Sequence, residues 1–75
     1  PPPDHIRRIL SHRLCNFDLS EFAWAKISDA AQGLSQADIV AAADDAARDA
    51  VLEAEGRLTE NEVLRALRER TFPIS

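Results

Sequence analysis

The sequence is poor in the residues that hold many small proteins together: it has one cysteine, no methionine, no tyrosine and an aromatic fraction of 5%. Cys15 stands alone, so no disulfide can form within the chain, and a reduced, cytoplasmic setting fits. With few aromatic side chains, a chain of 75 residues must build its core from close packing of small and aliphatic side chains. We therefore expect one domain over residues 1–75, of modest stability on its own.

Basic charge and long apolar runs are also lacking. The formal net charge of −4 argues against a dedicated binder of nucleic acid or of anionic membranes, because both need a basic surface. No apolar run approaches membrane-spanning length, and no signal-peptide pattern is present. The arginines nevertheless cluster near the two ends of the chain: Arg7, Arg8, Arg13, Arg65, Arg68 and Arg70. Such clusters form either solvated helix faces or an edge that meets an acidic neighbour.

The motifs of an autonomous enzyme are missing as well. There is no phosphate-binding loop of the form G-x-x-x-x-G-K-[ST] and no acidic pair at a strand end to hold magnesium. His5 and His12 are too far apart on a helix to form a zinc site, and the aspartates of residues 38–49 lack the glycine turn of a calcium loop. No triad-like arrangement of Ser, Cys and His is apparent. We expect no catalytic site in this chain.

What the sequence does contain is one helix-start pattern used three times, in Asp18-x-x-Glu21, Ser35-x-x-Asp38 and Thr59-x-x-Glu62. In each, an oxygen-bearing side chain can accept from free amides at a helix N-terminus, and the acid three residues later can reach back. Apolar residues flank each pair, as in a hydrophobic staple. The repetition predicts an all-helical chain.

The apolar spacing predicts helices over residues 4–14, 19–32, 36–55 and 60–70, with Gly33 and Gly56 ending the second and third. The residues expected to face inward are Ile6, Ile9, Leu10, Leu14, Leu19, Phe22, Ala23, Ile27, Ala30, Ile39, Ala43, Ala46, Ala47, Ala50, Ala54, Val63, Leu64 and Leu67, with Val40 and Val51 at the margin. Pro73 prevents the last helix from continuing, so residues 71–75 should be extended. The expected fold class is all-α, a compact four-helix bundle with an extended C-terminal tail.

Several segments together resemble a known family. Residues 27–39, I-S-D-A-A-Q-G-L-S-Q-A-D-I, resemble the pattern L-A-x-x-T-x-G-[FY]-S-G-A-D-[IL] of the lid of AAA ATPases. Residues 46–50 and 62–67 resemble its later motifs E-A-x-x-x-A and D-F-x-x-A-L, and Pro3-Asp4 with Ile9-Leu10 is similar to its opening P-x-x-x-R-x-x-I-L. The resemblance covers essentially the whole chain, in the right order.

This resemblance implies that residues 1–75 are the C-terminal helical lid, or small domain, of an AAA+ ATPase, in the branch where a Gly-Ala pair replaces a phosphate-sensing arginine. Such a lid covers the nucleotide bound by a preceding large domain and relays ATP-state changes to neighbouring subunits of a homo-oligomeric ring, a hexamer. The parent protein would hydrolyse ATP with Mg²⁺, whereas the isolated domain would hold no cofactor. The first residues, Pro1-Pro2-Pro3, and the absence of methionine fit a fragment of a longer protein and an excised initiator equally well.

Carried over by position, the turn beside the nucleotide would consist of Gly33, Ser35, Gln36 and Ala37. Gln36 stands where the family pattern has glycine, which would reshape or weaken the contact. Two further departures are Ala31 in place of Thr and Ser28 in place of Ala. The family often has a ribose-contacting histidine at the end of the first helix. His12 lies one residue short of that register, and Arg13 occupies it.

Trp24 lies off the expected inward stripe of the second helix. It either closes the edge of the core or anchors an interface with a neighbouring subunit, for which an exposed tryptophan is suited. A different class of function is also compatible with these helices: a free-standing helical module that binds another protein.

Overall fold

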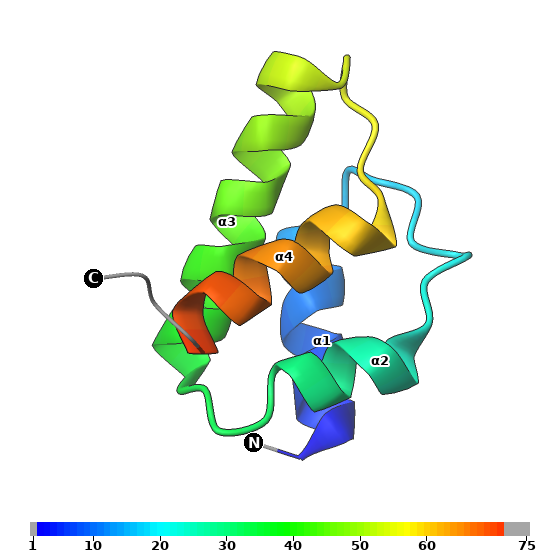
Figure 1. The fold of residues 1–75 in the computed structure, drawn as a ribbon. Helices are drawn as coiled ribbons and strands as arrows, with labels where there is room; N and C mark the ends of the chain where they lie inside the picture. Colours follow the sequence, from blue (N-terminus) through cyan, green and yellow to red (C-terminus); the bar gives the residue numbers. More distant parts are fainter. Residues whose placement is uncertain (1, 72–75) are drawn as a thin grey trace.

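In the computed structural model, which describes residues 2–71, the chain forms four helices and no strand over that range. They are α1 (Pro3–Arg13), α2 (Trp24–Ala30), α3 (Gln36–Glu53) and α4 (Glu60–Thr71) (Figure 1). The predicted all-α class and the number of helices are confirmed for this range. Of the predicted extended tail, residues 72–75 lie outside the described part of the chain, and Thr71 belongs to α4.

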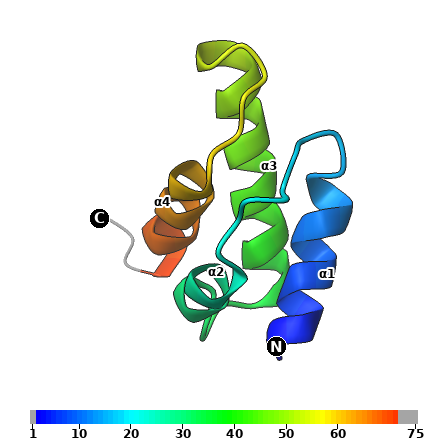
Figure 2. The ribbon, with the colours of Figure 1, turned by 90° about the vertical axis from the view of Figure 1, so that its right-hand side faces the viewer.

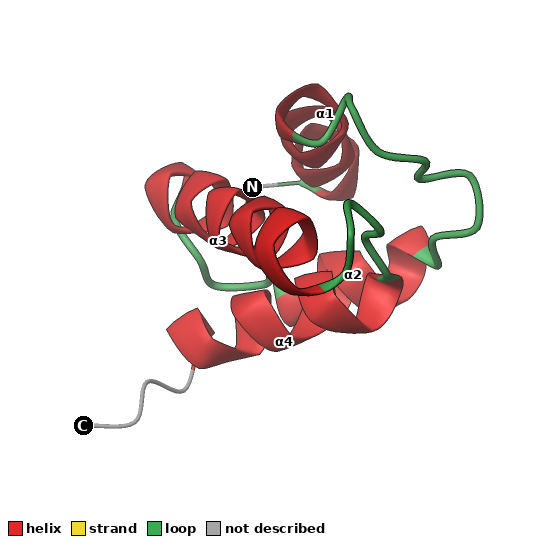
Figure 3. Ribbon diagram, turned by 90° about the horizontal axis from the view of Figure 1, so that it is seen from above, coloured by secondary structure: helices red, strands yellow, loops and turns green. Residues whose placement is uncertain are grey.

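The four helices close a ring around the core. The pairs that pack are α3 with α4, α1 with α3, α2 with α4 and α1 with α2. In Figure 2, α1 and α4 lie on opposite sides of α3. Seen from above in Figure 3, α1 and α3 form one layer and α2 and α4 form the other. The arrangement is thus compact, with each helix packed against two others.

The core lies inside this ring and contains aliphatic and small side chains: Ile6, Leu10, Leu14, Ile27, Ala31, Leu34, Ile39, Ala42, Ala43, Ala46, Val63, Leu64 and Leu67. Most of the predicted inward residues are therefore buried. On α3, Ala42 is buried although it was not expected to be, whereas Val51 is 63% exposed. Val51 is exposed because the C-terminal end of α3 extends past the other helices, as Figures 1 and 2 show.

The caps of two of the three predicted helix starts are present, whereas the return bonds from the acids are not: Asp38 contacts Arg70, and Glu62 Oε2 is buried without a partner. The Ser35 hydroxyl accepts from the Asp38 amide at 3.1 Å and begins α3, and the Thr59 hydroxyl accepts from the Glu62 amide at 3.4 Å and begins α4. Each bond gives a partner to an amide that the first helical turn leaves free. The N-terminal limits of both helices therefore follow from local sequence.

The third predicted start is wrong. The second helix was expected over residues 19–32, but α2 spans only Trp24–Ala30. The Asp18 carboxylate accepts from the amide and the hydroxyl of Ser20, at 3.0 and 2.7 Å, and so holds a local turn. Aspartate side chains often bond to amides two residues on, and this turn competes with helix initiation.

The start of α2 depends on a distant residue instead. Ala23, the residue before α2, offers no side-chain cap, and its amide donates to the Glu60 carboxylate at the start of α4. The segment before it keeps Phe17, Leu19 and Phe22 against the core without being helical. Burial of these side chains is thus achieved from an irregular connection.

The end of α3 is set by two residues with positive φ. Glu55 has φ 54° and Gly56 has φ 83°. The Gly56 amide donates to the Ala50 carbonyl at 2.8 Å, which gives a partner to one of the free carbonyls of the last turn. Glycine adopts this conformation without steric cost, whereas a glutamate does not.

We expect Glu55→Gly to raise the free energy of unfolding by about 0.5–1 kcal/mol, because it relieves the left-handed strain at a small entropic cost. Glu53→Gly is the matched control, since it places glycine in the last helical turn and should lower stability by up to about 1 kcal/mol. Urea denaturation followed by circular dichroism measures both. A lower free energy of unfolding in Glu55→Gly would contradict the conclusion that the backbone of Glu55 is strained.

The small residues of α3 give a second prediction. Ala43 is fully buried, so Ala43→Leu should lower the free energy of unfolding by about 1–3 kcal/mol through overpacking. Ala25→Leu, on the exposed side of α2, should change it by less than about 0.5 kcal/mol. Equal effects of the two substitutions on thermal or urea unfolding would show that the core can accept a larger side chain at position 43, and would contradict the close packing of helices on α3.

Candidate functional site

A groove of about 530 Å³ lies between the exposed side of α1 and the first turns of α3. Its lining residues are His5, Arg8, Ile9, His12, Arg13, Gln36 and Val40. Two of the residues singled out from the sequence, His12 and Gln36, thus face the same hollow although 24 positions separate them in the chain. This groove is the candidate functional site.

The α1 side of the groove follows from helical spacing. His5, Arg8 and His12 are three and four residues apart, so their side chains lie above one another on one face of the helix. Ile9, on the same side, is half-buried and packs against the core. The opposite face of α1 carries the buried Ile6 and Leu10, which fixes this polar face toward solvent.

The α3 side of the groove is its N-terminal turn. Gln36 is the first residue of α3, and Val40 lies one turn further along the same face. The Ser35 hydroxyl bonds the Asp38 amide, so the cap leaves the amides at the very start of the helix to other partners. The Asp38 carboxylate is engaged by Arg70 of α4, whose Nε lies 3.4 Å from its Oδ1.

The other residues of the expected turn are placed beside the groove rather than in its lining. Gly33 is exposed and has φ 85°, a conformation that favours glycine, while Ser35 acts as the N-cap of α3. Ala37 is exposed on the first turn. The turn therefore shapes the N-terminus of α3, and Gln36 is its one member among the lining residues.

Sequence reasoning placed Arg13 at the register of the family's ribose-contacting histidine, but it did not assign four other lining residues to the site: His5, Arg8, Ile9 and Val40. The spacing of His5, Arg8 and His12 was a usable signal, because it places them on one helix face. Nothing in the sequence, however, tells which other element that face lies against. Only the packing of α1 on α3 provides the second wall.

The groove has a charge opposite to that of the whole chain. Its permanently charged lining residues are Arg8 and Arg13, and none of its seven lining residues is acidic, although the chain carries a formal charge of −4. Ile9 and Val40 add apolar surface between the cations and Gln36. The helix N-terminus adds a partial positive charge. Such a surface suits a ligand that is anionic at one end and flat and apolar at the other.

Trp24 lies apart from this groove. It is half-buried and packs against the core, with its ring centroid 5.9 Å from that of Phe22. The guanidinium of Arg7 lies over its ring, 5.2 Å from the centroid, as in a cation–π contact. Trp24 thus closes an edge of the core and keeps an outer part in solvent, and its role in an interface stays a prediction.

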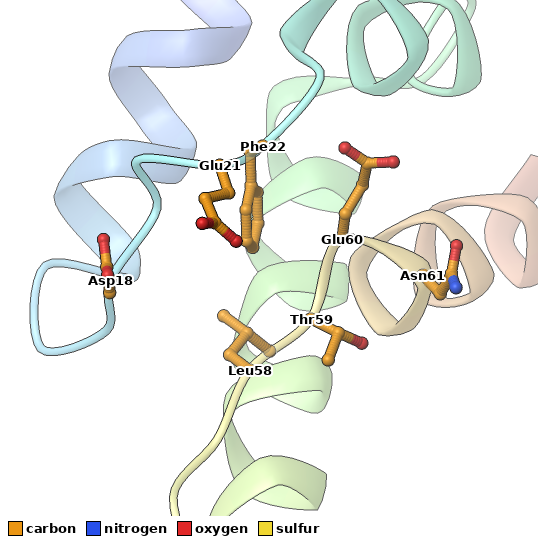
Figure 4. A pocket seen from close by; sticks show the side chains of 7 residues that line it. All are labelled: Asp18, Glu21, Phe22, Leu58, Thr59, Glu60 and Asn61. Atoms are coloured by element: carbon orange, nitrogen blue, oxygen red, sulfur yellow. The ribbon is translucent and has the colours of Figure 1, made fainter.

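A second hollow, drawn in Figure 4, lies where the connections before α2 and before α4 meet. Its lining residues are Asp18, Glu21, Phe22, Leu58, Thr59, Glu60 and Asn61. Glu60 and Asp18 are both occupied by the structural bonds described above. We therefore infer that Glu60 and Asp18 stabilise the irregular connection before α2 and do not form a binding site.

Among residues 2–71, no three His, Cys, Asp or Glu side chains gather in a way that could hold a metal ion. In the same part of the chain, none of the helices combines the length and the apolar character that a bilayer crossing requires.

Comparisons with known proteins returned no relative: no family model, no curated protein and no solved structure matches this chain.

The Asp18 turn gives a prediction on pH. Hydrogen bonds from the Ser20 hydroxyl, and then from its amide, lower the pKa of the Asp18 carboxyl below its ordinary value of 3.8. The contribution of this carboxylate to stability is thus present above pH 3.8 and is lost as pH falls through the lowered pKa. Ser20→Ala should raise the pKa toward 3.8, whereas Ser11→Ala should leave it unchanged. Carboxyl-carbon NMR titration measures both, and an unchanged pKa in Ser20→Ala would disprove the assignment.

Proposed function

We propose that this chain is the C-terminal lid domain of an AAA+ ATPase. In this role it covers a nucleotide held by a preceding large domain and relays ATP-state changes to neighbouring subunits of a homo-oligomeric ring. The observation that carries the proposal is the groove in which His12 of α1 meets Gln36 at the start of α3. These are residues at or next to the positions that the family resemblance assigns to nucleotide contact.

The composition of the groove supports a nucleotide as the ligand. Arg8 and Arg13 supply positive charge for phosphate oxygens, and the N-terminus of α3 adds to it. Ile9 and Val40 supply apolar surface against which a base can lie. The groove is open and has one wall from each of two helices, so the remaining contacts would come from the large domain. Mg²⁺ and the catalytic groups would belong to that domain too.

Gln36 distinguishes this lid from the family pattern, which has glycine there. Its side chain lines the groove beside Val40 and takes up space that a glycine leaves free. A carboxamide both donates and accepts hydrogen bonds, so it suits a hydroxyl or a base edge. We therefore expect a nucleotide contact whose geometry differs from that of lids with glycine at this position.

A protein interaction module is the second candidate function. The observation that favours it is the exposure of two large apolar side chains, Val51 and Leu52, on α3. They lie near the C-terminal end of the helix, whereas the groove lies at its N-terminal end. The two functions therefore use separate surfaces and are compatible in one domain.

The lid proposal predicts weak nucleotide binding by the 75-residue chain. Titration with Mg-ADP, followed by ¹⁵N NMR, should give a dissociation constant on the order of millimolar, because only one side of the site is present. Shift changes should centre on the groove. Arg8→Gln should weaken binding several-fold, while Arg68→Gln on α4 should leave it unchanged.

Two outcomes would contradict the proposal. One is micromolar nucleotide binding by the isolated chain, which would indicate a complete site of its own. The other is a coding sequence that has no phosphate-binding loop of the form G-x-x-x-x-G-K-[ST] ahead of Pro1.

A further inference from the structure

The C-terminal end of α4 lies against the start of α3, at the same end of that helix as the candidate functional groove (Figure 1). Arg70 contacts two carboxylates there. Its Nε donates to Asp38 Oδ1 at 3.4 Å, and its Nη1 lies 3.9 Å from Asp45 Oδ2. Asp38 and Asp45 are seven residues apart, which places them two turns apart on one face of α3. The guanidinium of Arg70 thus bridges the first and the third turn of α3.

Thr71 holds the end of α4 in this place. Its hydroxyl lies 3.4 Å from the Ala30 carbonyl oxygen, at the end of α2, and 3.1 Å from the Leu67 carbonyl oxygen of its own helix. The one hydroxyl proton is shared between these two acceptors. The Leu67 side chain is fully buried, so the last turn of α4 is fixed both in the core and against α2. Arg70 therefore projects onto α3 from a turn that is itself held in position.

The charges around the groove make Asp38 the side chain that opposes an anionic ligand. The α1 wall is basic, since α1 has three arginines and one acid, Asp4. On α3, Asp38 is the acidic residue of the first turn. A helix is about 10–12 Å across, so this carboxylate acts on the groove from about one Debye length away. Without compensation, it would oppose the partial positive charge of the helix N-terminus.

We propose that Arg70 raises the electrostatic potential of the nucleotide groove by offsetting the charge of Asp38, and so favours binding of the phosphates. Arg70 is not among the lining residues, so it acts through Asp38 and is a positioning residue. The inference rests on the proposed function, because it concerns the same groove and the same ligand. The two side chains are 37% and 42% exposed, so solvent screens the pair and limits the effect on affinity to a few-fold.

Variants at the two positions test the effect on affinity, in titrations with Mg-ADP followed by ¹⁵N NMR at low ionic strength. Arg70→Gln should weaken binding about two- to threefold, and Arg70→Lys, which keeps the charge, should retain most of the affinity. Asp38→Asn should strengthen binding, and Arg70→Gln combined with Asp38→Asn should bind about as well as the parent chain. If the contact only braced the fold, breaking it from either side would weaken binding, so the sign for Asp38→Asn separates the two roles. Arg68→Gln is the control and should change nothing.

A second measurement reports the potential at the start of α3 without a nucleotide. A nitroxide in solution speeds the relaxation of nearby amide protons, so the ratio between an anionic and a cationic nitroxide gives the local potential. At the Gln36 and Ala37 amides, the preference for the anionic probe should fall in Arg70→Gln and return when Asp38→Asn is added. Both differences should shrink as salt is raised from about 0.01 M to about 1 M.

The proposal is overturned if Arg70→Gln leaves the nitroxide preference unchanged, or leaves the affinity unchanged in a parent chain that binds Mg-ADP. It is also overturned if Asp38→Asn weakens binding, or if the ratio of parent to Arg70→Gln affinity does not fall with salt. A parent chain that does not bind Mg-ADP would contradict the lid function instead. The nitroxide ratio would then still decide whether Arg70 sets the potential at the start of α3.

Discussion

The close approach of helices to the small side chains of α3 is the constraint on which the structure depends. Ala42, Ala43 and Ala46 are buried where α3 meets its neighbours, and the large side chains that fill the core come mostly from the other elements. Because alanine allows short interhelical distances, α1 and α4 can both pack on α3 and leave little space between them. The positions of α1 and α4 in turn determine where their outer faces can meet other elements. The candidate functional groove is a consequence of this packing, since α3 forms one wall and α1 the other.

Much of this fold was predictable because the local sequence determines where several helices begin. Ser35 and Thr59 each bond an amide three residues ahead, and such bonds need no information from the rest of the chain. The burial of Val63, Leu64 and Leu67 likewise follows from their spacing along α4. The same reasoning failed at residues 19–23, where the sequence carries an equally good pattern. There the Asp18 carboxylate accepts from Ser20 and does not cap a helix. The amide of Ala23, which precedes α2, donates instead to the Glu60 carboxylate of α4.

The candidate site was predictable to a lesser degree. The family resemblance pointed to Gln36 and, less directly, to His12, and both line the groove. Arg8 and Val40 were not recognised, because a residue's membership of a groove depends on the angle and offset at which two helices pack. Those quantities come from the whole core and have no signature in a short window of sequence. The exposure of Val51 was similarly unpredictable, since the helical pattern does not reveal where α3 extends beyond the helices that pack against it.

The bond from the Ala23 amide to Glu60 also bears on the order in which the chain folds. With seven residues, α2 is too short to be stable alone in water, and its N-terminal side lacks a side-chain cap from its own segment. The acceptor lies 37 positions away, at the start of α4, so the loop between them must close before the bond can form. Helices α3 and α4 begin with caps of their own and can form early. We therefore expect the second helix in the chain to consolidate only after the fourth has docked, because its N-terminal side takes its side-chain partner from there.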